Sequence, residues 1–159
     1  YTNTPLPPPR DLDGEGTVKG PGEYEIKGIG IHGWATETSP AEIRSAYLVK
    51  TEDLSLVFLG HLSKELNPEL LEHVGGADVL FIPVGGTPYL TGLMAAKLVK
   101  QLSPKLVIPS FFKISSLTRK ADGVSPFLKE LGQEAEPQEK LVVKKKELPT
   151  STRAVVLSL

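Results

Sequence analysis

Three apolar segments decide the fold, and each of them runs into a loop: Leu56-Val57-Phe58-Leu59-Gly60-His61, Val79-Leu80-Phe81-Ile82-Pro83-Val84-Gly85-Gly86 and Leu106-Val107-Ile108-Pro109-Ser110-Phe111. In α/β folds, ligands and metals gather where such strands end. Here those ends carry one histidine, His61, the glycine pair Gly85-Gly86 and two phenylalanines, Phe111 and Phe112, whereas a hydrolase needs carboxylates and imidazoles. The sequence therefore indicates a fold more clearly than it indicates an activity.

Helical segments alternate with these strands in the second half of the chain. Asn67 and Pro68 predict a helix start, with Asn as the cap and Pro at the first helical position, and Gly75 predicts its end. Two further helices are expected over 91–102 and 126–131. Apolar strands between helices predict parallel crossovers and a sheet covered by helices.

The first half is predicted to contribute antiparallel strands. Segments 46–49 and 54–59 have the pattern of a hairpin, and residues 37–42 before them have the composition of a polar loop. Two closing strands are expected over 141–145 and 153–157. Antiparallel strands leading into a β-α-β-α-β half predict a layered α/β sandwich.

Composition and length favour a single globular domain. The chain has 159 residues, of which 40% are hydrophobic and 23% charged, which is ordinary for a soluble protein. Residues 1–19 are interpreted as a leader rich in Pro and Gly, because prolines such as Pro7 and Pro8 disfavour helix and ladder pairing. The domain itself is expected over 20–159.

Charge and cysteine content exclude several classes of protein. The net charge is −1, which gives no electrostatic attraction to nucleic acid or to an anionic membrane. The basic run 144–146 is interpreted as a solvated strand edge. There is no cysteine, so disulfides, thiolate metal sites and a cysteine nucleophile are excluded. This does not separate reducing from oxidising compartments, but it suits the cytosol, and we expect a cytoplasmic protein. No signal peptide and no membrane-spanning run are recognised in the sequence.

Several segments together resemble the metallo-β-lactamase-fold family, in its lactonase-like (L-ascorbate-6-phosphate lactonase-related) branch. The resemblance follows their order along residues 20–159, and it implies an αββα sandwich and a zinc- or manganese-dependent hydrolase. The segments are Gly20-Pro21-Gly22-Glu23-Tyr24-Glu25-Ile26-Lys27-Gly28, Tyr47-Leu48-Val49 with Phe58-Leu59-Gly60, Asp78 to Gly86, and Ala95 to Pro109.

The metal-ligand motifs that this family carries are missing or replaced. The family places a His-x-His-x-Asp-His run before the first of these segments, where this chain has only 2–7, and a further His near 36–38, where none is found. The resemblance places His61 where the family has its bridging Asp, and Phe111 where it has its last His. It therefore implies a degenerate pocket formed by His61, Phe111, Gly85 and Gly86, with no catalytic residue, no metal ligand and no cofactor.

The other histidines and the glycine pair have simpler interpretations. His32, in a strand, and His73, near a helix C-terminus, are interpreted as structural, because neither has a partner at ligand spacing. Gly85-Gly86 is interpreted as a tight turn, since it lacks the spacing of a phosphate-binding motif. Trp34 either anchors a partner or caps the core, and the sequence leaves both open.

Two further candidate groups give no catalytic arrangement. Ser110 and the pair 115–116 lack a nearby His and Asp. Glu23 and Glu25 alternate with apolar residues and are expected on the solvent face of a strand.

The leading hypothesis is a non-catalytic binding or structural module that is possibly a homo-oligomer and whose small-molecule ligand is unknown. We expect Phe111 to point toward the pocket with His61 across from it. The alternative is a zinc- or manganese-dependent hydrolase of a phosphate ester or lactone, with ligands supplied from upstream of Tyr1 or from another subunit. A third hypothesis is a phosphate-binding module that uses the Gly85-Gly86 turn.

Overall fold

One mixed β-sheet organises the chain. The computed structural model describes residues 18–39, 42–115, 118 and 120–158. Within them, seven strands lie in the sheet in the same order as in the sequence. The strands are β1 (Gly22–Ile26), β2 (Ile29–Thr38), β3 (Ile43–Lys50), β4 (Ser55–Phe58), β5 (Val79–Pro83), β6 (Leu106–Ser110) and β7 (Arg153–Ala154).

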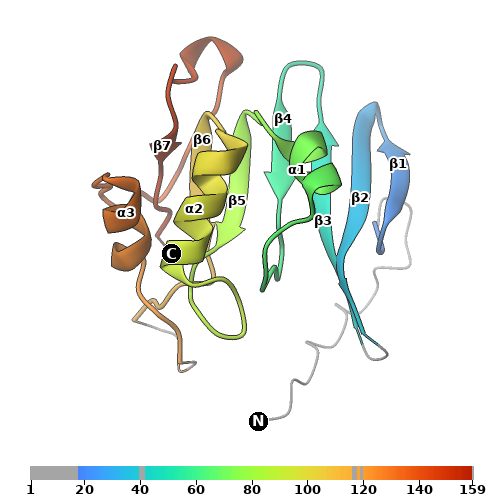
Figure 1. Cartoon of the computed structure of the whole chain (residues 1–159). Coiled ribbons are helices and arrows are strands. Elements are labelled where there is room, and N and C mark those ends of the chain that lie inside the picture. Colours follow the sequence, from blue (N-terminus) through green and yellow to red (C-terminus); the bar gives the residue numbers. More distant parts are fainter. Residues whose placement is uncertain (1–17, 40–41, 116–117, 119, 159) are drawn as a thin grey trace.

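The sheet changes from antiparallel to parallel at β4, as the sequence predicts. Strands β1 to β4 pair antiparallel, and β4 to β7 pair parallel. Helices α1 (Pro68–Val74) and α2 (Gly92–Leu102) connect the first parallel strands, and α3 (Ser125–Leu131) with the short 3₁₀ helix η1 (Lys145–Glu147) follows β6. Figure 1 shows α1 and α2 lying in front of the same face of the sheet. The parallel crossovers therefore place the C-terminal ends of β4, β5 and β6 along one edge.

Local capping fixes where the helices begin. Asn67 accepts a hydrogen bond from the Leu70 amide at the start of α1, and Thr91 accepts one from the Met94 amide at the start of α2. Helix α2 packs closely on α3 because Gly92 has no side chain: an added Cβ would lie 2.8 Å from the Phe127 amide nitrogen. The predicted starts of α1 and α2 are thereby confirmed.

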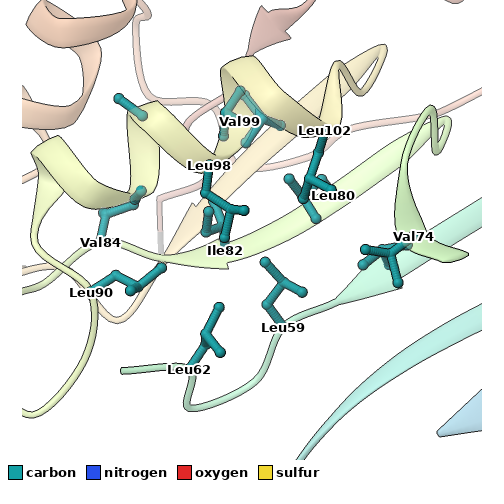
Figure 2. Close-up of a cluster of buried hydrophobic side chains, with 14 of the residues drawn as sticks. Leu59, Leu62, Val74, Leu80, Ile82, Val84, Leu90, Leu98, Val99 and Leu102 are labelled. Carbon is teal, nitrogen blue, oxygen red and sulfur yellow. The ribbon is translucent and has the colours of Figure 1, made fainter. Parts of the chain in front are cut away.

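The main core fills the space between the helices and the sheet. It joins buried side chains of β3 to β6 with those of α1, α2 and α3. Figure 2 shows the side chains of Leu80 and Ile82 from β5 together with Leu98 and Leu102 from α2. Fully burying an aliphatic side chain of this size stabilises a fold by about 1.5–3 kcal/mol, so this layer is the main source of stability.

Two segments differ from what the sequence pattern predicts. Residues 141–144 pair with no strand, and Lys145 begins η1 instead of ending a strand. Leu141 and Val143 nevertheless pack on the second face of the sheet, so their alternation reflects burial without ladder pairing. The expected loop 37–42 is shorter, because β2 extends to Thr38 through a bulge and β3 begins at Ile43.

The outer parts of the chain add two observations. The expected leader 1–19 falls almost entirely outside the described residues, as do the 2–7 segment and Ser116. In the described part, no helix is long and apolar enough to cross a membrane. The second closing strand is confirmed only in part, as β7 covers Arg153–Ala154 and Leu157 forms a single bridge with Gln138.

Candidate functional site

Three aromatic rings meet at the edge where β4, β5 and β6 end. His61 follows β4, Phe111 follows β6, and Tyr89 lies in the loop after β5. The His61 and Tyr89 rings stack with centroids 5.3 Å apart, and Phe111 is tilted against both, with centroids 4.9 Å from His61 and 4.8 Å from Tyr89. The structure therefore brings His61 and Phe111 into contact, as expected. We call these three residues the ring cluster.

Tyr89 was not anticipated from the sequence. It belongs to no recognisable motif. Its loop is fixed by the neighbouring Leu90, whose amide donates a hydrogen bond to the Leu62 carbonyl. The signal that identifies it is its position: an aromatic residue a few positions after a buried strand of a parallel sheet lies near the strand ends.

Phe111 is presented on an unusual backbone. Its φ is 58°, in the left-handed region that non-glycine residues rarely adopt. Its carbonyl oxygen fits against Gly85, where an added Cβ would overlap it. Residues held in such conformations cluster at binding and catalytic sites, at a cost of about 1–3 kcal/mol each.

The ring of Phe111 is not buried. The residue is 37% exposed, so it fills only part of the space at the strand ends. The stabilisation that full burial of a phenylalanine gives, about 1.5–3 kcal/mol, is therefore not reached here. The exposed part of the ring remains accessible to a ligand or partner.

Gly85 and Gly86 form a tight turn beside the ring cluster. The Gly86 amide donates to the Leu90 carbonyl, and the Tyr89 amide donates back to the Gly86 carbonyl. Gly86 has a φ of 72°, and an added Cβ there would overlap the Asp122 carboxylate. Because one amide of the turn is occupied and a carboxylate faces it, the geometry does not favour a phosphate ligand.

A polar network holds the loop that carries His61. Glu37 accepts hydrogen bonds from the Ser63 amide at 3.0 Å and from the Ser63 hydroxyl at 2.6 Å. Arg44 donates to the His61 carbonyl at 3.1 Å and lies 3.6 Å from the Glu37 carboxylate. Burial raises the pKa of Glu37, but the Ser63 hydrogen bonds and the charges of Arg44 and Lys64 lower it more, so the net pKa is below its ordinary value. These partners fix the orientation of the loop.

The other two histidines flank a tryptophan elsewhere. His32 stacks on Trp34 in β2 with ring centroids 3.9 Å apart, and His73 of α1 also stacks on Trp34, with centroids 5.4 Å apart. Trp34 also packs against the main core. Both imidazoles therefore act as ring-stacking partners on Trp34, which is consistent with the structural roles predicted for them.

The remaining sequence predictions concern carboxylates and lysines. Glu23 and Glu25 are exposed on β1, as expected. The basic run is not a strand edge: Lys145 of η1 donates to both Asp78 oxygens, at 2.7 and 2.8 Å. Asp78 precedes β5, so this ion pair lies at the edge of the sheet opposite to the ring cluster. There it joins the C-terminal segment to the sheet.

The residues at the strand ends do not fit a metal centre. The ring cluster and its turn offer one imidazole, His61, and one carboxylate, Asp122, whereas a zinc site needs three or four ligands. Across the described residues, no group of three or more His, Cys, Asp or Glu side chains is placed to hold a metal ion.

The order and register of these elements define an α/β protein of the metallo-β-lactamase type. A model of the Beta-lactamase superfamily domain matches residues 7–110, and the chain belongs to this superfamily. The comparison with curated proteins gave no match.

Solved structures show the same fold. A proposed zinc-dependent hydrolase of the metallo-beta-lactamase superfamily from Thermotoga maritima is 28% identical with a TM-score of 0.78, over 88% of this chain and 70% of its own. The metallo hydrolase Igni18 from Ignicoccus hospitalis is 18% identical with a TM-score of 0.56, over 72% of this chain and 52% of its own. YhfI from Bacillus subtilis, a metallo-beta-lactamase fold protein, is 12% identical with a TM-score of 0.57, over 87% and 51%. The chain thus spans between half and 70% of these proteins.

Proposed function

We propose that this chain is a degenerate, non-catalytic member of the superfamily that acts as a binding or structural module. The observation that carries the proposal is the ring cluster. His61 and Phe111 lie in contact, 4.9 Å between ring centroids, at the strand ends where the sequence resemblance places two metal ligands. The phenyl ring of Phe111 in place of an imidazole removes a metal ligand and adds apolar surface.

The chemistry of the ring cluster suits binding better than bond cleavage. Hydrolysis needs a nucleophile or activated water together with a base and a group that stabilises developing charge. The strand ends supply one imidazole in ring contact with Tyr89 and Phe111, and one carboxylate at Asp122. Partly exposed aromatic rings bind apolar or planar groups by stacking, which requires no ionised partner.

Two finer assignments belong to this proposal. The four segments that run from Gly20 to Pro109 support placement in the lactonase-like branch. The absence of cysteine and the net charge of −1 support a cytoplasmic protein without a nucleic-acid partner.

The second candidate is a metal-dependent hydrolase whose missing ligands come from outside the described residues. The zinc-dependent activity proposed for the Thermotoga maritima protein favours it, as does that protein's identity of 28%. In that case His61 and Asp122 would be the two edge residues able to serve as ligands, and their removal would abolish activity.

A hydrolase assay separates the two candidates. The chain is tested with zinc or manganese on an aryl phosphodiester and on a simple lactone, beside the variants His61→Ala and Asp122→Asn. We expect only background hydrolysis, equal in all three proteins. Turnover by the native chain that falls at least tenfold in both variants would establish the hydrolase instead.

A further inference from the structure

The C-terminal segment crosses the second face of the sheet without joining its ladder. At one end, the Gln138 amide donates to the Val156 carbonyl, and at the other end, the Arg153 amide donates to the Lys105 carbonyl. We call residues 139–151, which lie between these points, the strap. The backbone hydrogen bonds described for the strap are the two internal bonds at η1. Its backbone is therefore fixed to the sheet only beyond its two ends.

The apolar contacts of the strap are few. Leu141, Val143 and Leu148 are half-buried and pack on the second face of the sheet, while Val142 between them is 61% exposed. The buried residues beneath are Val79, Leu106, Ile108 and Val155. Every residue of the strap loses backbone freedom when it is ordered, and three partly buried side chains offset only part of that loss.

One ion pair joins the middle of the strap to the sheet. The Lys145 ammonium donates to both oxygens of Asp78, at 2.7 and 2.8 Å. Oδ2 of Asp78 also accepts from the amide and the hydroxyl of Ser55, but Lys145 is the only partner of Oδ1 among the described residues. The Asp78 side chain is 9% exposed and that of Lys145 is 54% exposed. A nearly buried charge of the sheet is thus balanced from the strap.

This arrangement makes the position of the strap depend on the pair. If the cation is removed while the strap is closed, the Asp78 carboxylate stays in an environment of low polarity without its counter-charge, which is unfavourable. If the strap moves away, the carboxylate is hydrated instead. Segments with few buried contacts open at a lower free energy than the core of the same protein. Loss of the Lys145 charge therefore favours the open strap.

We propose that the strap is a cover that opens locally while the rest of the fold stays intact, and that the Lys145–Asp78 pair is the latch that keeps it closed. Opening uncovers the buried apolar residues of β5 and β6 on the second face. Contiguous exposed apolar surface marks interaction sites, so the latch controls whether such a surface is presented. The inference concerns the opposite edge from the ring cluster and does not depend on the absence of catalysis.

Thiol labelling tests the local opening, because the chain has no cysteine. The variant Val79→Cys places one thiol beneath the strap, and the matched control Val57→Cys places one in the main core on the helix side. The two native residues are 1% and 0% exposed, so each thiol reacts only when its site opens. We expect the thiol of Val79→Cys to react at least about tenfold faster than that of Val57→Cys.

Urea separates local opening from global unfolding. Opening of the strap exposes little surface, so urea below the unfolding transition should change the labelling rate of Val79→Cys only slightly. The rate of Val57→Cys should rise steeply with urea, because its site opens only on global unfolding. Circular dichroism checks the folding of both variants. If Val79→Cys does not fold, Ile108→Cys replaces it, since Ile108 belongs to the same cluster and is 5% exposed.

Substitutions in the basic run test the latch. Lys145→Met, combined with Val79→Cys, should accelerate labelling at least about tenfold, because the buried carboxylate loses its cation. The matched control Lys146→Met removes an exposed charge next to it and should leave the rate unchanged. Asp78→Asn should also accelerate labelling. In the double variant with Lys145→Met, the effect should fall at least about tenfold short of the product of the single effects, since both remove the same pair.

Three results would overturn the proposal. Equal labelling of Val79→Cys and Val57→Cys, with the same dependence on urea, would mean that the second face opens only when the whole chain unfolds. Equal rates in Lys145→Met and Lys146→Met would mean that the ion pair is not the latch. Effects of Lys145→Met and Asp78→Asn that multiply in the double variant would mean that the two residues act separately.

Discussion

Phe111 and Gly85 depend on each other at the strand-end edge. The left-handed backbone of Phe111 turns its carbonyl toward Gly85, and that approach is possible because Gly85 has no Cβ. The position of the ring is therefore determined by a glycine on the neighbouring strand end and not only by the ring contacts.

Replacing this glycine should displace Phe111. We expect Gly85→Ala to lower the free energy of unfolding by about 2 kcal/mol, because overpacking at a rigid site costs about 1–3 kcal/mol. Urea unfolding measures the change. The control is Gly123→Ala, where no atom lies within 4 Å of an added Cβ. Equal stability of the two variants would mean that the close contact at Gly85 does not position Phe111.

The ionised carboxylate of Asp78 stabilises the fold through its hydrogen bonds with Lys145 and Ser55. Burial raises its pKa, but the hydrogen bonds from Lys145 and Ser55 lower it more, so the net pKa lies below its ordinary value of 3.8. A carboxyl whose pKa is lower in the folded state stabilises the fold fully above its ordinary pKa. That contribution is lost as the pH falls through the folded value.

Substituting Asp78 should therefore remove part of the acid sensitivity. Asp78→Asn is expected to cost about 2 kcal/mol at pH 7, the contribution of hydrogen bonds to a charged group, and to reduce the loss of stability below about pH 4. Denaturant unfolding at pH 7 and in steps from pH 5 to pH 2 measures both effects. Glu147→Gln, in an exposed pair with Lys144, is the control and should change stability little. An unchanged acid profile in Asp78→Asn would show that other groups dominate.

At the scale of elements, the loop after β4 is held from outside the ring cluster. Glu37 at the end of β2 binds Ser63, and Arg44 of β3 binds the His61 carbonyl. Two strands thereby position a loop that lies between β4 and α1. The network fixes the backbone at His61 and thereby keeps its ring in contact with Tyr89 and Phe111.

Removing the Glu37 carboxylate should release this loop. In Glu37→Ala, the Ser63 amide loses its acceptor, and we expect its hydrogen exchange to accelerate about tenfold, which corresponds to a bond of about 1.5 kcal/mol to a charged acceptor. The control is Glu42→Ala, which removes only an exposed partner of Arg44. Equal exchange at Ser63 in both variants would mean that the network does not hold the loop.

The elements also show what the sequence alone could predict. Helices α1 and α2 were predictable because caps and apolar periodicity are local signals. The three apolar strands were predictable from their continuous runs of apolar residues. Segment 141–145 was not, since Leu141 and Val143 alternate as in a strand but pack on the sheet without pairing. Tyr89 and Asp122 were missed because their place at the site depends on the turn at Gly86, which is a tertiary contact.

At the scale of the whole molecule, the two faces and one edge of the sheet have separate roles. The helix side carries the main core, the opposite side packs against the C-terminal segment, and the edge at the C-terminal ends of the strands carries the ring cluster. The position of the edge follows from the parallel crossovers, and it was predictable from the sequence. The chemistry at that edge differs from that of a metal-dependent hydrolase, because the side chains that meet there are the rings of His61, Tyr89 and Phe111.

The residues at the strand-end edge do not form a metal centre, and elemental analysis of the intact chain checks this. The chain is purified without chelator and its zinc and manganese are measured per chain. Because the described residues contain no group of three metal-ligating side chains, we expect neither metal to be held stoichiometrically. One or more tightly bound zinc or manganese ions per chain, lost in His61→Ala, would show that the edge is a metal centre.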